Sequence, residues 1–451
     1  MNFTRDGEKL VITSALRTPI GQAGKSLSKL QSFDLGALVI EELFKRNGLS
    51  KDKIDSVIVG EIAQSSKAPN VARVLSVRTG LPLESSALTV ANNCVSGFEA
   101  IFEASRRILL GESELVLVGG EESMSNMPIY LKNAQHNPKT ATVAKIEKNW
   151  SEIPDLEDVQ VTDGVDEGLV DPVRHANMAE TGEVVAQILG IEKKDLDAYA
   201  HGSYSKALKA IQDGTYKPWL VPIEHEKGVL EDDEFIMSKT GFVEKPERFE
   251  KATAIFEMLP GGIQEFYKKY ESWIGRPYEE GKTKGAISLF NACPRSDGAG
   301  ALLVTTESKA KELGLEIQAY IKGWGNYGVD PIIMGLGMSN SMNKALSNSG
   351  LSWSDIGIYE IHEAFAATAL GSIRKVKEEY GFDLEKKLSE NAINPNGGTL
   401  ALGHPLGMTG IRVVINQLID FTQNPSTQYT MGTICAGGGV GGALILENPK
   451  S

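Results

Sequence analysis

Short apolar runs along the chain alternate with segments whose apolar residues recur every three or four positions. The runs predict strands over 10–14, 56–59, 87–91, 115–118 and, much later, 301–305. The periodic segments predict helices over 35–46 and 96–110. This order is typical of stacked βαβ units, so the sequence predicts an α/β fold.

The same layout returns in the last third of the chain. Strands over 319–323 and 356–361 are each followed by a predicted helix, over 338–347 and 365–380. A helix over 410–421 and strands over 429–434 and 443–447 complete the series. Both halves place a glycine-containing turn before a helix, at Cys94 and at His404, so the repeat is one of architecture rather than of residues.

The segment 121–284 differs from both halves. It is rich in Lys, Glu and Asp, poor in strand signals and interrupted by Pro and Gly, with two predicted helices over 178–189 and 194–213. Long insertions often carry binding functions. We therefore predict an inserted loop domain, between a first half formed by 1–120 with 285–306 and a second half formed by 307–451.

The composition narrows the class of protein. The chain has 451 residues, 41% of them hydrophobic and 23% charged, which excludes disordered and collagen-like proteins. Lys plus Arg number 46 against 59 Asp plus Glu, and this acidic balance argues against nucleic acid or an anionic membrane as the main partner. No apolar stretch approaches the ~18 residues of a membrane span, and the N-terminal residues do not read as a signal peptide. Because the three cysteines are too few for a disulfide framework, we expect a cytoplasmic protein.

The turn around Cys94 carries the first candidate for chemistry. It lies between the predicted strand over 87–91 and a helix that begins near Val95. A helix N-terminus favours thiolate over thiol, and thiolate is the nucleophile. Cys94 is therefore a candidate nucleophile, the alternative being an inert buried cysteine.

Three further turns lie at the ends of predicted elements. Five glycines surround His404, so a ligand or another loop could approach it, the alternative being a structural turn. His362 ends a strand, and a zinc-protease motif fails there because Ala366 stands in place of the second histidine. Cys435 opens a glycine-rich loop, whose N–H groups can stabilise an oxyanion. A strand rather than a phosphate-binding helix follows that loop, which argues against a dinucleotide site.

Two cysteines and two histidines at element boundaries form a constellation, and with them the chain resembles a thiolase. The motifs that carry the resemblance span nearly the whole chain: Arg17-Thr18-Pro19-Ile20-Gly21, the Cys94 turn, 119–125, Ser296-Asp297-Gly298-Ala299, Met334-Gly335, His362-Glu363-Ala364-Phe365, Gly403-His404-Pro405 and the Cys435 loop. The resemblance implies a thiolase-like duplicated fold, with two βαβαβαββ halves in α/β/α/β/α layers and a loop domain covering the CoA site.

The resemblance also implies catalytic roles. Cys94 would attack the 3-keto carbon of a 3-ketoacyl-CoA and hold the acyl group as a thioester, while His404 takes the Cys94 proton and faces the thioester oxygen. Cys435 would protonate the departing acetyl-CoA enolate and then deprotonate the incoming CoA thiol. His362 would hold a catalytic water at the enolate oxygen, and the backbone N–H groups of Cys94 and Gly437 would form a second oxyanion hole. CoA and acyl-CoA are substrates, and no permanently bound cofactor or metal is implied.

The substrate-binding candidates are less specific. Arg248 is the candidate for a CoA phosphate, and Met334 and Phe365 are candidates for the acyl or pantetheine channel, with a solvated charge and ordinary core packing as the alternatives. Cys293 stands where thiolases usually have serine beside the pantetheine, although a packed core residue is the interpretation that we prefer there.

Other functions stay open beside thiolytic cleavage. His362, where many thiolases have asparagine, favours the degradative His-Glu-Ala-Phe branch over an acetoacetyl-CoA-forming enzyme. Cys435 argues against a ketoacyl-synthase-like condensing enzyme, and the intact Cys94, His404 and Cys435 argue against a non-catalytic scaffold. The resemblance implies a homodimer or homotetramer, and a hydratase–dehydrogenase partner is a further prediction.

Overall fold

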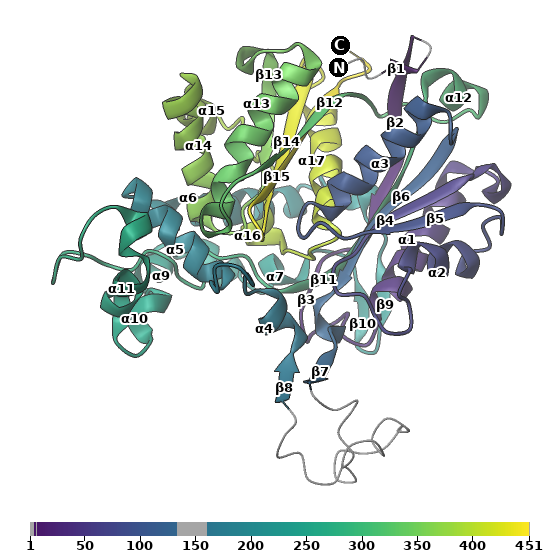
Figure 1. Cartoon of the computed structure of the whole chain (residues 1–451). Helices are drawn as coiled ribbons and strands as arrows, with labels where there is room; N and C mark the ends of the chain where they lie inside the picture. Colours follow the sequence, from purple (N-terminus) through teal and green to yellow (C-terminus); the bar gives the residue numbers. More distant parts are fainter. Residues whose placement is uncertain (1–3, 6, 133–159, 451) are drawn as a thin grey trace, which may run out of the picture.

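The computed structural model describes residues 4–5, 7–132 and 160–450 (Figure 1). Its centre is a mixed sheet of 11 strands in the order β13-β14-β15-β12-β2-β11-β6-β4-β5, to which β1 (Thr4–Arg5) and β3 (Gly21–Gln22) add short pairs. The first half of the chain supplies β2 (Glu8–Arg17), β4 (Ser56–Gly60), β5 (Ser86–Val90), β6 (Leu115–Ser123) and β11 (Ser296–Thr306). The second half supplies β12 (Ala319–Gly328), β13 (Ile356–Ile361), β14 (Tyr429–Ala436) and β15 (Val440–Glu447).

The two halves share one topology, which confirms the predicted duplication. In each half the second and fourth strands along the chain are parallel neighbours, β4 with β6 and β13 with β14. The fifth strand then pairs antiparallel with the fourth and with the first. The third strand is β5 in the first half, whereas in the second half it shrinks to a single parallel bridge between Tyr359 and Ile393. The halves join where β2 meets β12.

Helices form three layers around the two half-sheets. The outer layers contain α1 (Ser32–Asn47) and α2 (Val71–Arg78) on one side and α13 (Gly337–Ser349) and α14 (Ala366–Tyr380) on the other, with α3 (Ser96–Leu110) and α17 (Thr409–Gln423) between the half-sheets (Figure 1). Successive residues of β6 show this layering, since Leu115 and Leu117 join the apolar cluster of α1 while Val116 and Val118 join that of α3. Strands buried on both faces read as continuous apolar runs, which is why the sequence revealed them.

The central helices approach each other at two glycines. A Cβ on Gly97 of α3 would lie 2.9 Å from the Cα of Gly410 on α17, and a Cβ on Gly410 would meet the backbone of Gly97 and Phe98. Only glycine allows two backbones to approach so closely. This contact brings the N-terminal ends of both helices to one place.

The described parts of the chain between β6 and β11 lie over one end of this core (Figure 1). Its longer helices are α5 (Met178–Leu189), α6 (Lys193–Gln212) and α11 (Gly262–Ile274). The helix α5 has the predicted bounds because Asn177 and Glu180 form a reciprocal cap and Gly190 ends it at a φ of 60°. The helix α11 and four short strands were not predicted.

The remaining elements are short. The strands are β7 (Ile129–Lys132), β8 (Gln160–Asp163), β9 (Ile223–His225) and β10 (Gly228–Leu230). The helices are α4 (Gly164–Gly168), α7 (Glu234–Met237), α8 (Thr240–Val243), α9 (Glu247–Lys251), α10 (Ile255–Met258), α12 (Glu307–Glu312), α15 (Leu384–Ser389) and α16 (Thr399–Leu402).

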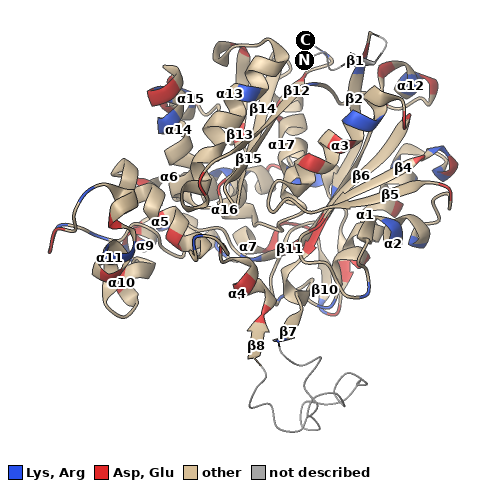
Figure 2. Cartoon of the chain, viewed as in Figure 1, with Lys and Arg blue, Asp and Glu red and all other residues tan. Residues whose placement is uncertain are grey.

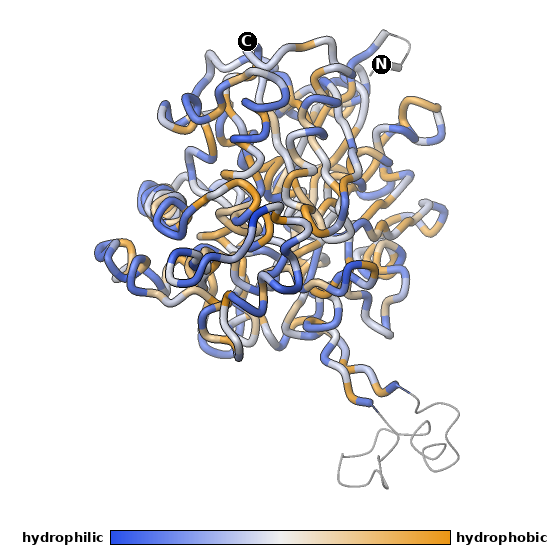
Figure 3. Tube along the Cα trace, turned by 60° about the vertical axis from the view of Figure 1, so that its left-hand side comes forward, coloured by the Kyte–Doolittle hydropathy of each residue, from blue (hydrophilic) through white to orange (hydrophobic). Residues whose placement is uncertain are grey.

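Charge and hydropathy follow the layers. Lys, Arg, Asp and Glu lie mostly on outer helices and loops (Figure 2), and the hydrophobic segments gather at the centre (Figure 3). Among the residues that the structure describes, no helix combines the length and the apolar character that a membrane crossing would need.

A buried ion pair ties the inserted segment to the core. The Arg17 guanidinium at the end of β2 donates to both carboxylate oxygens of Asp233, at 2.6 and 2.8 Å, and both side chains are fully buried. The backbone N–H of Ile20 also donates to Asp233, at 2.7 Å. Loss of one partner of such a pair destabilises the fold strongly, because the other partner is left as an unpaired buried charge.

We expect Asp233→Ala to lower the free energy of unfolding by about 3–5 kcal/mol, because the Arg17 charge remains buried without its partner. Asp213→Ala is the matched control, since it breaks the exposed Lys209–Asp213 pair at the end of α6 and should change little. Urea unfolding followed by circular dichroism measures both variants. Equal losses would contradict the anchoring role.

Candidate active site

The four residues singled out by sequence meet at one place. Cys94 precedes α3, and His404 lies between α16 and α17. His362 follows β13, and Cys435 is the second-last residue of β14. The Nε2 atom of His404 lies 3.1 Å from the Sγ atom of Cys94, and the two histidine rings are 4.5 Å apart between centroids. Cys94, His404 and Cys435 line one cavity of about 450 Å³, so both sulfur atoms share a pocket as the sequence predicted.

A strained turn presents Cys94. Asn93 has a φ of 46°, a left-handed conformation that asparagine tolerates better than most residues. The Ser96 hydroxyl closes the turn, because it accepts from the Asn92 N–H at 2.8 Å and donates to the Asn93 carbonyl at 2.6 Å. The Asn93 side chain donates to the Gly437 carbonyl at 2.8 Å. The nucleophile turn and the Cys435 loop are therefore fixed to each other.

A chain of hydrogen bonds fixes the tautomer of His404. The Thr409 hydroxyl donates to the Pro405 carbonyl at 2.9 Å, since a carbonyl only accepts. Its oxygen is 2.7 Å from His404 Nδ1, so it accepts the Nδ1 proton of the neutral ring. The lone pair of Nε2 then faces the Cys94 thiol, which is the arrangement of a general base.

His362 is fixed in the same way against Cys435. Its Nδ1 atom lies 3.2 Å from the Cys435 carbonyl oxygen and 3.5 Å from the Cys435 sulfur. Because the carbonyl only accepts, Nδ1 carries the proton and Nε2 has a free lone pair. Nε2 is buried and has no hydrogen-bond partner among the described protein groups, so it can accept a hydrogen bond from a molecule in the site.

The resting site carries little charge. Burial raises the pKa of the Cys94 thiol to about 12, although the N–H groups of Gly437 and of Cys94 itself act in the opposite direction. Burial, followed by the charge of Arg412, lowers the pKa of His404 to about 3. Burial also lowers the pKa of His362 well below its usual value and raises that of Cys435. Our expectation that the helix N-terminus favours thiolate is wrong for the resting site, because burial outweighs the helix N–H groups.

The substrate-binding candidates divide into two groups. Met334, Phe365 and Cys293 line the cavity, and Cys293 is half-buried, so it is not simply a core residue. Arg248 does not line it. This residue lies on α9 with its guanidinium 4.7 Å from the ring centre of Phe242.

The structure adds residues that the sequence analysis missed. Thr409 is five positions after His404, a spacing that carries no recognisable signal. Glu122 lies behind the site and accepts from the N–H groups of Ile62, Ala63 and Gly407, at 3.2, 3.0 and 3.0 Å. The cavity is also lined by Met124, Asp166, Leu169, Val170, Asn177, Met178, Ala179, Pro294, Arg295, Ala364, Leu406 and Gly437.

Comparison with known proteins identifies the family that shares this fold. The family model described as Thiolase, N-terminal domain, matches residues 10–262, and Thiolase, C-terminal domain, matches residues 315–448. The chain belongs to the thiolase family. This thiolase is therefore an acyltransferase. A relative from Staphylococcus aureus (strain COL), described as a probable acetyl-CoA acyltransferase, is 33% identical over 447 residues, 98% of this chain and 100% of the relative.

Solved thiolases share the whole fold. Human mitochondrial 3-ketoacyl-CoA thiolase in complex with CoA matches with a TM-score of 0.82 and 29% identity, over 98% of each chain. The Bacillus anthracis acetyl-CoA acetyltransferase matches with a TM-score of 0.80 and 29% identity, over 98% of this thiolase and 99% of that chain. The predicted thiolase-like fold is thus confirmed.

The hydrogen bond from His404 to Thr409 can be tested directly. We expect Thr409→Val to slow alkylation of Cys94 by iodoacetamide about ten- to a hundredfold, because the loss of one orienting hydrogen bond costs about 1–3 kcal/mol. Thr409→Ser keeps the hydroxyl and is the control that should react like the unchanged protein. A valine variant that matches the serine variant would show that the hydroxyl does not orient the ring.

Proposed function

We propose that this thiolase cleaves 3-ketoacyl-CoA with CoA, giving acetyl-CoA and a shortened acyl-CoA through an acyl group on Cys94. The observation that supports this most strongly is that Cys94, His404 and Cys435 line one cavity, with His362 directly against Cys435. Thiolytic cleavage needs one thiol as nucleophile and a second group to carry a proton in each direction. Solved relatives in complex with CoA are consistent with CoA as the substrate.

In the first half-reaction Cys94 attacks the 3-keto carbon as His404 Nε2 takes its proton. Attack and deprotonation occur together, because burial disfavours a thiolate at rest. The bond between C2 and C3 then breaks, and its electron pair remains on C2 as the enolate of acetyl-CoA. Cys435 gives its proton to C2, which leaves a Cys435 thiolate. The Nδ1–H of His362 lies 3.5 Å from that sulfur and can stabilise its charge.

In the second half-reaction the Cys435 thiolate takes the proton of the incoming CoA thiol. The CoA sulfur attacks the thioester on Cys94, the acyl group passes to CoA, and Cys94 recovers its proton from His404. Each sulfur and each imidazole returns to its starting state.

Two groups of donors would stabilise the negative oxygens of these steps. The backbone N–H groups of Cys94 and Gly437 face the thioester oxygen in our proposal, and Gly437 already lies against the Cys94 sulfur. A water at His362 would donate one proton to the free Nε2 lone pair and the other to the enolate oxygen, a geometry that the His362 tautomer requires.

The direction of the reaction in the cell stays a proposal. His362 in place of asparagine supports degradation, and acetoacetyl-CoA formation is the alternative, because the same groups run the chemistry backwards. Cys435 supports either thiolase reaction over a ketoacyl synthase, which uses a single thiol. A homodimer or homotetramer, a hydratase–dehydrogenase partner and a cytoplasmic location remain predictions, as do the residue bounds given for the two halves and the inserted domain.

The two cysteines should separate the half-reactions. Cys94→Ser should lower turnover by about a thousandfold or more and abolish acetylation by acetyl-CoA, because the nucleophile is lost. Cys435→Ser should still be acetylated on Cys94 but should lose carbon–carbon cleavage to a similar degree. Mass spectrometry of the protein reports acetylation of Cys94, and CoA-dependent loss of 3-ketoacyl-CoA reports the whole reaction.

Cys293→Ser is the matched control, since it alters the third thiol of the same cavity and should keep both half-reactions. Equal loss of acetylation in the Cys94 and Cys435 variants would contradict the proposed division of roles. Acetylation without any cleavage in the unchanged protein would favour a condensing enzyme.

A further inference from the structure

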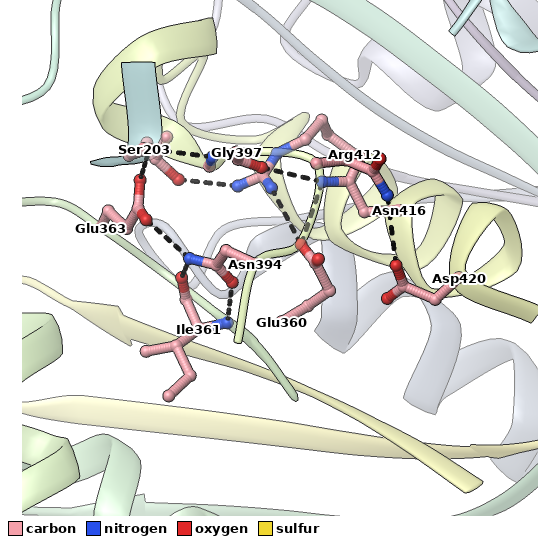
Figure 4. A network of polar contacts seen from close by, with 12 residues as sticks. Ser203, Glu360, Ile361, Glu363, Asn394, Gly397, Arg412, Asn416 and Asp420 are labelled. Atoms are coloured by element: carbon pink, nitrogen blue, oxygen red, sulfur yellow. Dashed lines mark hydrogen bonds and ion pairs between the residues drawn. The ribbon is translucent and has the colours of Figure 1, made fainter. Parts of the chain in front are cut away.

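A set of buried charges that the proposed mechanism does not use lies among the segments that carry the two histidines. Figure 4 shows Arg412, Glu360, Glu363 and Asp420 of this set. Arg412 on α17 is only 1% exposed. Its Nη2 donates to the Thr399 hydroxyl at 2.7 Å, and its Nη1 lies 3.7 Å from a carboxylate oxygen of Glu360. Its Nε has no hydrogen-bond partner among the described groups. A guanidinium buried with so few partners needs an explanation beyond packing.

Arg412 touches both segments that carry the histidines. Thr399 begins α16, which ends just ahead of His404. Glu360 lies near the end of β13, two residues before His362. Arg412 follows Thr409, which holds the His404 ring, by three residues and so lies one turn further along α17.

A second charged group braces the same segments from the other side. The buried Glu363 carboxylate accepts from Ser203 at 2.7 Å, from Asn394 at 2.7 Å and from the N–H of Leu400 at 3.2 Å (Figure 4). Thus α16 is held between an anion next to His362 and the Arg412 cation. The position of His404 depends on both.

Two carboxyl groups accompany the single guanidinium. Glu360 accepts from Asn416 at 2.9 Å, and Asp420 accepts from Asn396 at 3.3 Å, while one oxygen of each carboxyl has no partner among the described groups. Burial raises the pKa of Glu360 to about 7 and that of Asp420 well above its usual value. The pair therefore does not carry two full charges near neutrality.

The other titratable groups near this cluster come from several elements. Tyr216, Glu363 and Arg17 also act electrostatically on the Arg412 guanidinium. Lys206 on α6 acts on Glu360.

We propose that Arg412 is a positioning residue for the thiolase reaction: it ties Thr399, at the start of α16, to Glu360, two residues before His362, and its buried positive charge adds to burial in opposing protonation of the two active-site imidazoles. The proposal rests on the proposed function, because that mechanism needs His404 as a base and His362 as an acceptor. A nearby cation opposes a second positive charge on either ring. As the pH falls, the Glu360–Asp420 pair takes up a proton before the histidines do, and the Arg412 charge then acts on the rings with less compensation.

Three variants test this. Arg412→Gln keeps a donor for Thr399 but removes the charge, Arg412→Lys keeps the charge without the planar fork, and Glu360→Gln imitates the protonated carboxyl. The readouts are the titration of the histidine rings by ¹⁵N NMR in the substrate-free protein and the pH profile of 3-ketoacyl-CoA cleavage. The chain has six histidines, so the spectrum can be assigned by His362→Gln and His404→Gln.

We expect Arg412→Gln to move the titration of His362 and His404 upward by about one pH unit or more. The acid limb of the pH profile of cleavage should move upward with it. Arg412→Lys should titrate like the unchanged protein even if its maximal rate is lower. Glu360→Gln should leave the titration in place or move it downward, the opposite sign to Arg412→Gln.

A purely structural role would lower the maximal rate without moving the limb, and that result would overturn the proposal. An upward shift of the titration in Glu360→Gln would also overturn it. Because Glu360→Gln retains Arg412, this variant still tests the proposal if Arg412→Gln does not fold. The ring titration needs no substrate, so it remains decisive even if the chain does not cleave 3-ketoacyl-CoA.

Discussion

The close contact between α3 and α17 decides where chemistry can occur in this fold. Each helix begins at a turn that carries one reactive side chain, Cys94 in the first half and His404 in the second. Glycine at positions 97 and 410 lets the two backbones touch, so the turns meet instead of being held a side-chain width apart. The distance of 3.1 Å between sulfur and imidazole is a consequence of that contact. A larger side chain at either glycine would separate base from nucleophile before it altered any catalytic group.

The same contact explains why most of the site is buried and nearly neutral. The turns meet between two half-sheets, where burial raises thiol pKa values and lowers imidazole pKa values. A permanent thiolate–imidazolium pair would be costly there. In the proposed mechanism charge instead appears only as bonds form and break, and fixed N–H donors that need no rearrangement stabilise such charge best. The tautomers set by Thr409 and by the Cys435 carbonyl are part of this preorganisation.

The sequence predicted those parts of the fold that leave a periodic or continuous apolar signal. Strands buried on both faces and helices with clear caps, such as α5, were located closely. The third strand of the second half was not predicted, because one bridge at Ile393 leaves no pattern. The four residues that meet at the candidate site were singled out because each stands at an element boundary. Thr409 and the charges around Arg412 could not be found, since their roles depend on contacts between segments that are distant in sequence. Arg248 was assigned from likeness alone, and the structure places it away from the cavity lining.

The duplication also shows how two equivalent positions acquired different uses. In each half the residue after the second strand and a residue near the end of the fourth strand lie side by side. These residues are His362 and Cys435 in the second half. Because Gly60 pairs with Gly120 as Ile361 pairs with Thr433, the corresponding residues of the first half are Glu61 and Glu122. Cys435 lies beside the Cys94 turn of the other half, and Glu122 accepts from Gly407 in the His404 turn of the other half. The pseudo-symmetric contact is thus kept in both directions. One copy holds Cys435 and His362, which in the proposed mechanism handle protons and bind a water, and the other holds a buried carboxyl that accepts three backbone N–H groups. In that mechanism one end of the duplicated architecture positions His404 as the base while the other end carries the second thiol.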